Sequence, residues 1–467
     1  MYGIVRAITP EANALLHDGL HALSKASDRG IPVDVAYCKH QQKRLAKRIF
    51  KLEEKVWKTD IGKEWKRKYG VRAKLSDPDQ ARHIIFNVLK MDESDGRSVS
   101  KDVLLGLDHP ITKPILKARG YEKASGTFLN NIIRETVDGL MHPGFHLHRV
   151  ITFRSSSSGP NFQNFPMRDP EIAKLVRSAF RAPPGWVIVE FDYSSLEVRV
   201  GTCYHMDPMM VTYLKDSTTD MHRDSAMDCY RLEQDQVMKN SRYAAKNRYV
   251  FPEFYGSYWA QVAPDLWKAI AELGLTLPDG TGLYDHLAAQ GIHELGHIQE
   301  SESSKGRGRP SPNSYLKHIM QVESNFWGAR FPVYAQWKKD WYKKYQKRGY
   351  LDTLTGFRCS GVMKRNEVIN SPVQGSAFHC LLKAFIETQR DLEKRKMEAH
   401  LVGQIHDSAV GLSPIGELPD FLRVANECST ARLMDAWDWI KVPLEIEVEV
   451  SPDGGTWYEK EEVRIPA

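Results

Sequence analysis

Residues 185–200 read GWVIVEFDYSSLEVRV, and this stretch decides the fold. From Trp186 to Phe191 the side chains are bulky and mostly apolar, which is typical of a buried strand. The strand then ends in a carboxylate, Asp192. Removing a charge from water at the end of a core strand is costly unless a partner compensates for it. The sequence therefore predicts a cationic partner for Asp192.

A second apolar stretch, HLVGQIHDSAVGL (residues 400–412), also contains a carboxylate. We predict a hairpin that turns at His406 and Asp407, although a single Asp after an apolar run usually only caps a turn. Two such aspartates side by side repel each other. Two Mg²⁺ ions about 3.5–4 Å apart would remove the repulsion and hold both oxygens of an in-line phosphoryl displacement. Magnesium prefers such hard oxygen ligands, and Mn²⁺ could replace it.

Composition limits the remaining possibilities. The chain has 467 residues, 42% hydrophobic and 27% charged, as in an ordinary globular protein of two to four subdomains. The six cysteines are scattered without zinc-ligand spacing, nothing at the start resembles a signal peptide, and no apolar run is long enough to cross a membrane. We therefore expect a cytoplasmic protein. Its net charge of +6 permits a nucleic-acid partner.

Residues 10–60 have helical periodicity, with apolar side chains at Leu45, Ile49, Leu52 and Val56. The basic residues around them form either a solvated face or a surface that lies along a phosphate backbone. Further along, the run QESESSKGRGRPSPNS (299–314) has the composition of a mobile loop.

Five segments resemble the motifs of family A DNA polymerases, in family order. FDYSSLEVRV resembles motif A, D-Y-S-Q-I-E-L-R, and QIHDSAV resembles motif C, Q-V-H-D-E, with Ser408 in place of the glutamate. TFRSSSSGPNFQNFP is similar to T-G-R-L-S-S-x-x-P-N-L-Q-N-I-P, and INSPVQGSA to N-x-P-x-Q-G-T-A. The end, VPLEIEVEV, is similar to the closing P-L-x-V-E-V.

This resemblance implies an α+β fold with right-hand polymerase architecture: an antiparallel-sheet palm with mostly helical fingers and thumb. It implies a template-directed enzyme that adds dNTPs to a primer 3′-hydroxyl on primer–template DNA and releases pyrophosphate. We expect no 3′–5′ exonuclease domain in this chain, so an exonuclease or replisome proteins could be separate partners. The insertion in the fingers is similar to those of viral members and suggests a bacteriophage source. The expected parts are an N-terminal segment and thumb (1–145), palm (146–235), fingers (236–345) with an insertion (258–314), and palm again (346–467).

By the resemblance, Asp192 and Asp407 are catalytic metal ligands, and the backbone carbonyl of Tyr193 is a further ligand. Glu197 matches the residue that reads the sugar, where a carboxylate and an aromatic ring leave no room for a 2′-hydroxyl. The alternative for Glu197 is an ion pair with Arg199, because two residues apart in a strand share a face.

The segment QVMKNSRYAAKNRYVFPEFYGSYW (236–259) resembles the fingers helix R-x-x-x-K-x-x-x-F-G-x-x-Y-G. Arg242 and Lys246 are four residues apart and share a helical face, an arrangement that suits a triphosphate. By the resemblance, Lys246 is also catalytic. The alternative is an ordinary solvated basic face.

Lys246 and Tyr255 are nine residues apart, whereas the family has eight. We predict that a π-bulge just before Pro252 absorbs the extra residue. Phe251 then lies by the sugar and Tyr255 beside the templating position. If the lysine register carries through instead, Val250 and Phe254 take those places.

Other site residues rest on the resemblance alone. His222, in TDMHRDSA, matches a histidine that reaches the triphosphate. A further set matches residues that contact primer and template, where minor-groove acceptors allow binding without sequence preference: Arg154, Asn161, Gln163, Asn164, Asn370, Gln374 and His406.

Three other functions compete with DNA synthesis. A single-subunit RNA polymerase would share the paired aspartates, but Glu197 and the NFQNFP segment argue against it. A metal-dependent nuclease would have no use for the cations at 242 and 246. A non-catalytic DNA-binding relative would not need both aspartates.

Overall fold

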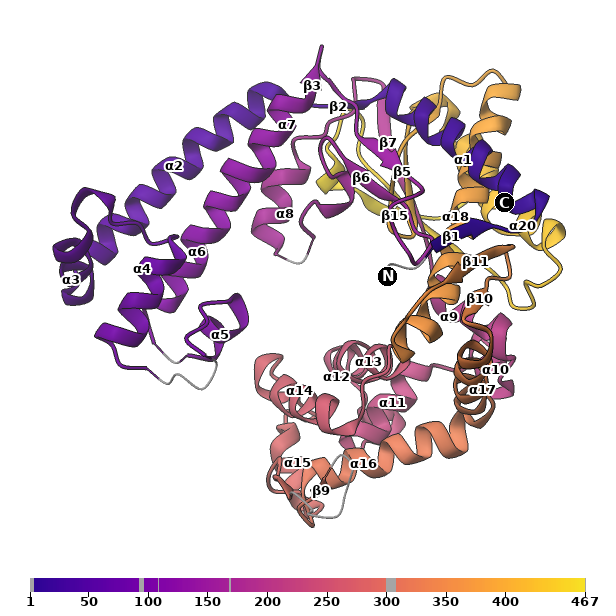
Figure 1. The fold of residues 1–467 in the computed structure, drawn as a ribbon. Helices are drawn as coiled ribbons and strands as arrows, with labels where there is room; N and C mark the ends of the chain where they lie inside the picture. Colours follow the sequence, from indigo (N-terminus) through magenta and orange to yellow (C-terminus); the bar gives the residue numbers. More distant parts are fainter. Residues whose placement is uncertain (1–3, 92–95, 108, 168, 300–307, 467) are drawn as a thin grey trace.

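The structure is a computed structural model and describes residues 4–91, 96–107, 109–167, 169–299 and 308–466. The ribbon has a C-shaped outline, with a central sheet between a helical arm and a helical lobe (Figure 1). Helices and antiparallel sheets occur together, so the predicted α+β class is confirmed. The described residues contain no helix that is both long and apolar enough to span a bilayer.

The central sheet has the strand order β12-β13-β7-β14-β15, and each neighbouring pair is antiparallel. Both quoted stretches form strands here, as predicted. The strands are β7 (Trp186–Tyr193), β12 (His400–Ile405), β13 (Ser408–Pro414), β14 (Ile446–Val450) and β15 (Glu461–Val463).

Both faces of β7 are buried, which explains its nearly continuous apolar run. Val189 and Phe191 pack into the cluster formed with α18 (Arg365–Lys394) and α19 (Leu418–Ser429). Ile188 points to the other side, into a cluster with Phe162 and Trp457. The sheet thus holds the end of β7 rigidly.

The N-terminal residues pack beside the sheet rather than on the arm. Strand β1 (Ile4–Ala7) pairs with β11 (Phe357–Ser360), and α1 (Pro10–Arg29) ends before Gly30, which has φ 72°. Buried side chains of α1 join the core cluster of α18. Helix α1 thus buries its apolar face against the sheet layer. The expected division of residues 1–145 into an N-terminal segment and a thumb stays a prediction.

The helical arm comprises residues 35–135. Its first helix is amphipathic as predicted, since Leu45 is fully buried while the lysines around it remain at the surface. The arm contains α2 (Val35–Trp57), α3 (Asp60–Tyr69), α4 (Pro78–Arg82), α5 (Lys101–Gly106), α6 (Thr112–Glu122) and α7 (Asn130–Glu135).

The helical lobe comprises residues 196–348. The part beyond α9 (Leu196–His205) has a core of its own, whereas Leu196 and Val200 of α9 are buried in the cluster of α18. Residues 300–307, half of the loop predicted at 299–314, lie outside the described residues. The lobe contains α9 (Leu196–His205), α10 (Pro208–Lys215), α11 (Met221–Tyr230), α12 (Lys239–Ala245), α13 (Phe251–Phe254), α14 (Trp259–Glu272), α15 (Leu283–Ala289), α16 (Tyr315–Asn325) and α17 (Pro332–Arg348).

Short elements complete the chain: β2 (Ile31–Pro32), β3 (Thr136–Val137), β4 (Leu140–Met141), β5 (Gly144–His146), β6 (Ser156–Ser158), α8 (Pro170–Arg177), β8 (Ile298–Gln299), β9 (Arg309–Pro310), β10 (Tyr350–Asp352) and α20 (Ala431–Ala436).

Candidate active site

The pairing of β7 with β13 brings Asp192 and Asp407 together. Asp192 is the penultimate residue of β7, and its strand partner is Ser408, the first residue of β13. Asp407 lies in the turn just before Ser408, and its carbonyl oxygen accepts a hydrogen bond from the Tyr193 N–H at 3.4 Å. The hairpin turn predicted at His406 and Asp407 is confirmed, and His406 adopts a left-handed conformation there (φ 51°).

The two carboxylates repel each other. Burial of the carboxyl group raises the pKa of Asp192 to about 7, and the charge of Asp407 adds to this effect. Burial also raises the pKa of Asp407, against the opposing charge of Arg154. An opposite charge between the two groups would favour their ionised forms, so the pair calls for a cation.

The oxygen atoms of this pair fit a hard divalent cation. Asp407 Oδ1 is buried without a hydrogen-bond partner, and Arg154 Nη2 lies 3.6 Å from it. The Tyr193 hydroxyl donates to the Ser429 carbonyl at 2.8 Å, so only the Tyr193 backbone is available as a ligand. Carboxylate and carbonyl oxygens are the ligands that Mg²⁺ prefers. Over the described ranges, no group of three or more His, Cys, Asp or Glu side chains could hold a metal ion.

Ser408 does not supply a substitute for the third carboxylate. Its hydroxyl donates to Glu190 Oε1 at 2.8 Å. Glu190 also accepts a hydrogen bond from Trp457 Nε1 at 2.7 Å and pairs with Lys460. Burial of Glu190 opposes its ionisation, but Lys460 and the hydrogen bonds from Trp457 and Ser408 together outweigh burial and lower the pKa of Glu190. This neighbouring carboxylate is therefore already compensated.

Glu197 lies in a helix, not in a strand as the ion-pair alternative supposed. It pairs with Arg154, and its Oε2 accepts a hydrogen bond from the Tyr255 hydroxyl at 2.6 Å. Arg199 pairs with Glu445 instead. The alternative was wrong because β7 ends at Tyr193, so residues 197 and 199 are not on one face of a strand.

A cavity of about 270 Å³ lies beside this cluster and collects predicted residues from distant segments. Sequence reasoning missed eight of its lining residues: Ser195, Leu196, Val198, Gly201, His205, Met210, Tyr334 and Val373. The rings of His205 and Tyr334 stack with centroids 4.1 Å apart, a packing contact that the sequence does not signal. The predicted residues that line the cavity are Arg154, Tyr193, Glu197, Phe251, Tyr255, Asn370, Gln374 and Asp407.

The helix that follows Arg242 contains the predicted irregularity. Residues Lys246–Val250 form a π-helical turn, directly before α13 and one residue ahead of Pro252, so the predicted π-bulge is confirmed. Phe251 lines the cavity and Tyr255 is 46% exposed, whereas Val250 is fully buried. Phe254 also reaches the cavity, but it is only 9% exposed and packs against Phe326 and Tyr334 in the lobe core.

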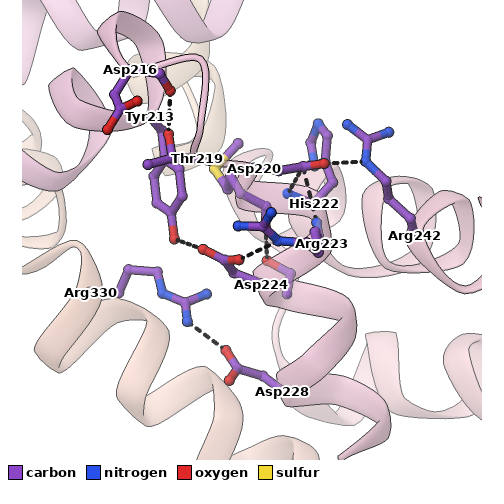
Figure 2. Close-up of polar contacts among 12 residues, drawn as sticks. Tyr213, Asp216, Thr219, Asp220, His222, Arg223, Asp224, Asp228, Arg242 and Arg330 are labelled. Atoms are coloured by element: carbon purple, nitrogen blue, oxygen red, sulfur yellow. Dashed lines mark hydrogen bonds and ion pairs between the residues drawn. The ribbon is translucent and has the colours of Figure 1, made fainter. Parts of the chain in front are cut away.

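Two of the predicted triphosphate-binding residues, Arg242 and His222, lie on either side of Asp220 (Figure 2). The third, Lys246, lies near the same Phe251 ring as His222. Arg242 Nε donates to Asp220 Oδ2 at 2.6 Å. The His222 ring is buried 5.8 Å from the Phe251 ring, and its Nδ1 has no partner. Burial, together with Lys246 and Arg242, lowers the pKa of His222 to about 4. This patch is electropositive, and His222 is neutral at pH 7.

Sequence reasoning missed Asp220, the partner of Arg242. Its Oδ1 also accepts hydrogen bonds from the His222 and Arg223 N–H groups at 3.0 and 3.1 Å, which caps α11. An Asp at this place before a helix is a readable N-cap signal. The ion pair with Arg242, 22 residues away, has no comparable signal.

Among the other predicted DNA contacts, Asn370 Nδ2 lies 3.5 Å from the Tyr255 carbonyl, and Gln374 lines the cavity. Gln163 lies outside the cavity and donates to Ser155 Oγ and to Gln404 Oε1, each at 2.8 Å. The other three residues predicted for this role are exposed outside the cavity: Asn161, Asn164 and His406.

Solved structures provide one independent comparison. The POL domain of Pol1 from M. smegmatis, in complex with DNA primer-template and dNTP, superposes with a TM-score of 0.72 and 20% identity. The match covers 95% of this chain and 70% of that one. The fold is therefore the right-hand polymerase architecture predicted from the sequence.

Sequence comparison gives the family. DNA polymerase I of Chloroflexus aurantiacus is 25% identical over 474 residues, with 95% of this chain and 44% of that protein covered. The thermostable DNA polymerase I of Thermus aquaticus is 26% identical over 445 residues, with 91% and 46% covered. The chain thus spans less than half the length of these relatives. They are bacterial and give no support to a bacteriophage source.

The sequence model described as DNA polymerase family A matches residues 35–272 and 320–459. The unmatched residues 273–319 overlap the insertion expected at 258–314, but the segment that forms α14 is matched. The matched ranges comprise most of the chain and include both aspartates and the helix with the π-turn. The chain belongs to DNA polymerase family A.

Proposed function

We propose that this chain is a template-directed DNA polymerase that adds dNTPs to a primer 3′-hydroxyl and releases pyrophosphate. One observation carries the proposal: Asp192 and Asp407 lie together beside a cavity that is lined by Asp407, Glu197 and Tyr255. Within this pair, Asp407 Oδ1 is buried and has no hydrogen-bond partner. Primer–template DNA and dNTP accompany the M. smegmatis domain, and we propose them as partners here.

Asp192 and Asp407, with the Tyr193 carbonyl, would hold two Mg²⁺ ions, for which Mn²⁺ could substitute. Bound there, the ions would supply charge neutralisation at the attacking and leaving oxygens. The protein's own part in nucleotidyl transfer is positioning rather than covalent chemistry. The rigid β7–β13 pairing supports this role because it fixes both carboxylates on one edge of the sheet.

The remaining residues would orient the nucleotide. Arg242 and Lys246 would bind the triphosphate, and neutral His222 would donate a hydrogen bond to it rather than add charge. Lys246 is supported in this role because it forms no ion pair among the described residues and lies 5.4 Å from the Phe251 ring centroid. Phe251 would pack under the sugar.

Glu197 would exclude a ribose 2′-hydroxyl, and Tyr255 would lie beside the templating base. Arg154, Asn370 and Gln374 would contact the primer–template near the cavity. Asn161, Gln163, Asn164 and His406 would contact the duplex farther along. In this scheme the helical arm, the central sheet and the helical lobe correspond to thumb, palm and fingers.

Primer extension tests the proposal. Asp192→Asn and Asp407→Asn should each abolish extension of a labelled primer while primer–template binding persists. Asp279→Asn, the same change at an exposed loop position, is the matched control and should extend normally. Shortening of the primer by the native chain would instead indicate a nuclease, and equal use of rNTPs would indicate an RNA polymerase.

A further inference from the structure

Helix α17 carries a row of cations on its exposed side. Lys339, Lys343 and Lys347 are spaced four residues apart, so they follow one another along one face of the helix. Lys344 and Arg348 form a second, adjacent row. All five side chains are exposed. Figure 1 places α17 at the edge of the lobe, next to β10.

These cations are not neutralised by the protein. Across the described parts of the chain, none of the five takes part in an ion pair. Asp340 is the one acidic residue of α17, and it accepts a hydrogen bond from Gln336 at 2.9 Å. Unpaired like charges on one ridge repel each other, so the ridge attracts a polyanion.

The row leads away from the candidate active site. Lys339 lines a cavity of about 490 Å³, and that cavity shares Tyr255 and Asn370 with the cavity beside the aspartates. Arg365, also in the larger cavity, lies 6.0 Å from the half-buried ring of Tyr342, which follows Lys339 by three residues. The larger cavity therefore extends from Tyr255 to Lys339 on α17.

We propose that this row binds the phosphate backbone of the single-stranded template on the 5′ side of the templating position. The inference rests on the proposed function, in which Tyr255 lies beside that position. Lys339 to Lys347 spans about 12 Å at 1.5 Å per residue, so the row can follow a few nucleotides of one strand. Tyr342 beside it offers a ring for base stacking.

Removal of two charges tests the proposal. The double variant Lys343→Gln/Lys347→Gln changes only exposed side chains that line neither cavity. Binding is measured on primer–templates with a 5′ template overhang of either one or about ten nucleotides. On the long overhang, the steepness of log K against log salt should be lower in the variant by about 1.4. This value is the loss of two phosphate contacts, at about 0.7 for each contact with a single strand. When salt rises from 50 to 200 mM, the native chain should therefore lose roughly sevenfold more affinity than the variant.

On the one-nucleotide overhang, the variant should bind and extend like the native chain. Lys394→Gln/Lys396→Gln is the matched control, because both lysines are exposed and lie outside α17 and the cavities. Equal losses on both overhangs would overturn the proposal. So would a loss confined to gapped substrates with a downstream duplex, since the partner would then be double-stranded. If the native chain extends no primer, the proposed function itself fails, which is a different result.

Discussion

Lys338 on α17 is held in surroundings that disfavour its charge. Its Nζ lies 3.1 Å from the ring centroid of Trp327 and 5.1 Å from that of Tyr334. Burial lowers the pKa of Lys338 from 10.5 to about 7, and Glu253 opposes this only in part. We therefore expect Lys338→Met, which keeps the length and removes the charge, to stabilise the protein at neutral pH.

The magnitude follows from linkage. A shift of about 3.5 pKa units corresponds to about 5 kcal/mol against the charged form. A cation–π contact offsets about 2 kcal/mol of this cost, which leaves a net gain of about 3 kcal/mol for the methionine variant. The folded-state pKa is depressed, so the cost is fully present below about pH 7 and is lost as the pH rises toward 10.5.

Urea unfolding of both proteins from pH 6 to pH 10 measures this difference. The advantage of Lys338→Met should be constant near pH 6–7 and shrink above pH 7. Lys339→Met is the control, because it is the same substitution at the neighbouring position, where the side chain is exposed. A methionine variant that is less stable at every pH, or an advantage independent of pH, would refute the reasoning.

Three further predictions concern the sheet. Lys460→Met should destabilise the fold by about 3–5 kcal/mol, because it leaves Glu190 buried without its cation; thermal unfolding measures this, and Lys460→Met/Glu190→Gln should recover part of the loss. Asp407→Asn should lower the pKa of Asp192 from about 7, since it removes the second cause of the shift; a carboxyl NMR titration without metal would show no change if the two groups did not interact. Phe162→Ala should cost about 3–5 kcal/mol, because the ring is fully buried; a loss under 1 kcal/mol in urea unfolding would contradict this packing.

The sequence predicted the features that follow from local pattern. The apolar run before Asp192 predicted a buried strand. The π-turn was predicted from the resemblance, because the spacing between Lys246 and Tyr255 is one residue longer than in the family motif and an extra residue in a helix must be absorbed somewhere. The resemblance to family A DNA polymerases also indicated which motifs to expect and their order along the chain. The predicted roles of the individual site residues remain predictions.

Contacts between distant segments could not be predicted in the same way. Arg154 and Glu197 are 43 residues apart, and their ion pair depends on how the lobe meets the sheet. The environment of Glu197 was also ambiguous, because it lies four residues after the end of β7 and the sequence pattern does not show where the strand ends and the helix begins. The position of residues 4–29 could not be predicted either, because it depends on the pairing of β1 with β11 and on the packing of α1 against α18.

The contact between Tyr255 and Glu197 has a consequence for the order of events. The carboxylate assigned to sugar recognition is already occupied by a phenol from the lobe and a guanidinium from the β5–β6 region. An arriving nucleotide would therefore have to displace one of these contacts, because the Glu197 carboxylate is not free to accept a new one. Selectivity for deoxyribose would then depend on how readily the hydrogen bond between Tyr255 and Glu197 breaks. A substitution at Tyr255 would alter the choice of sugar even if Tyr255 does not contact the sugar itself.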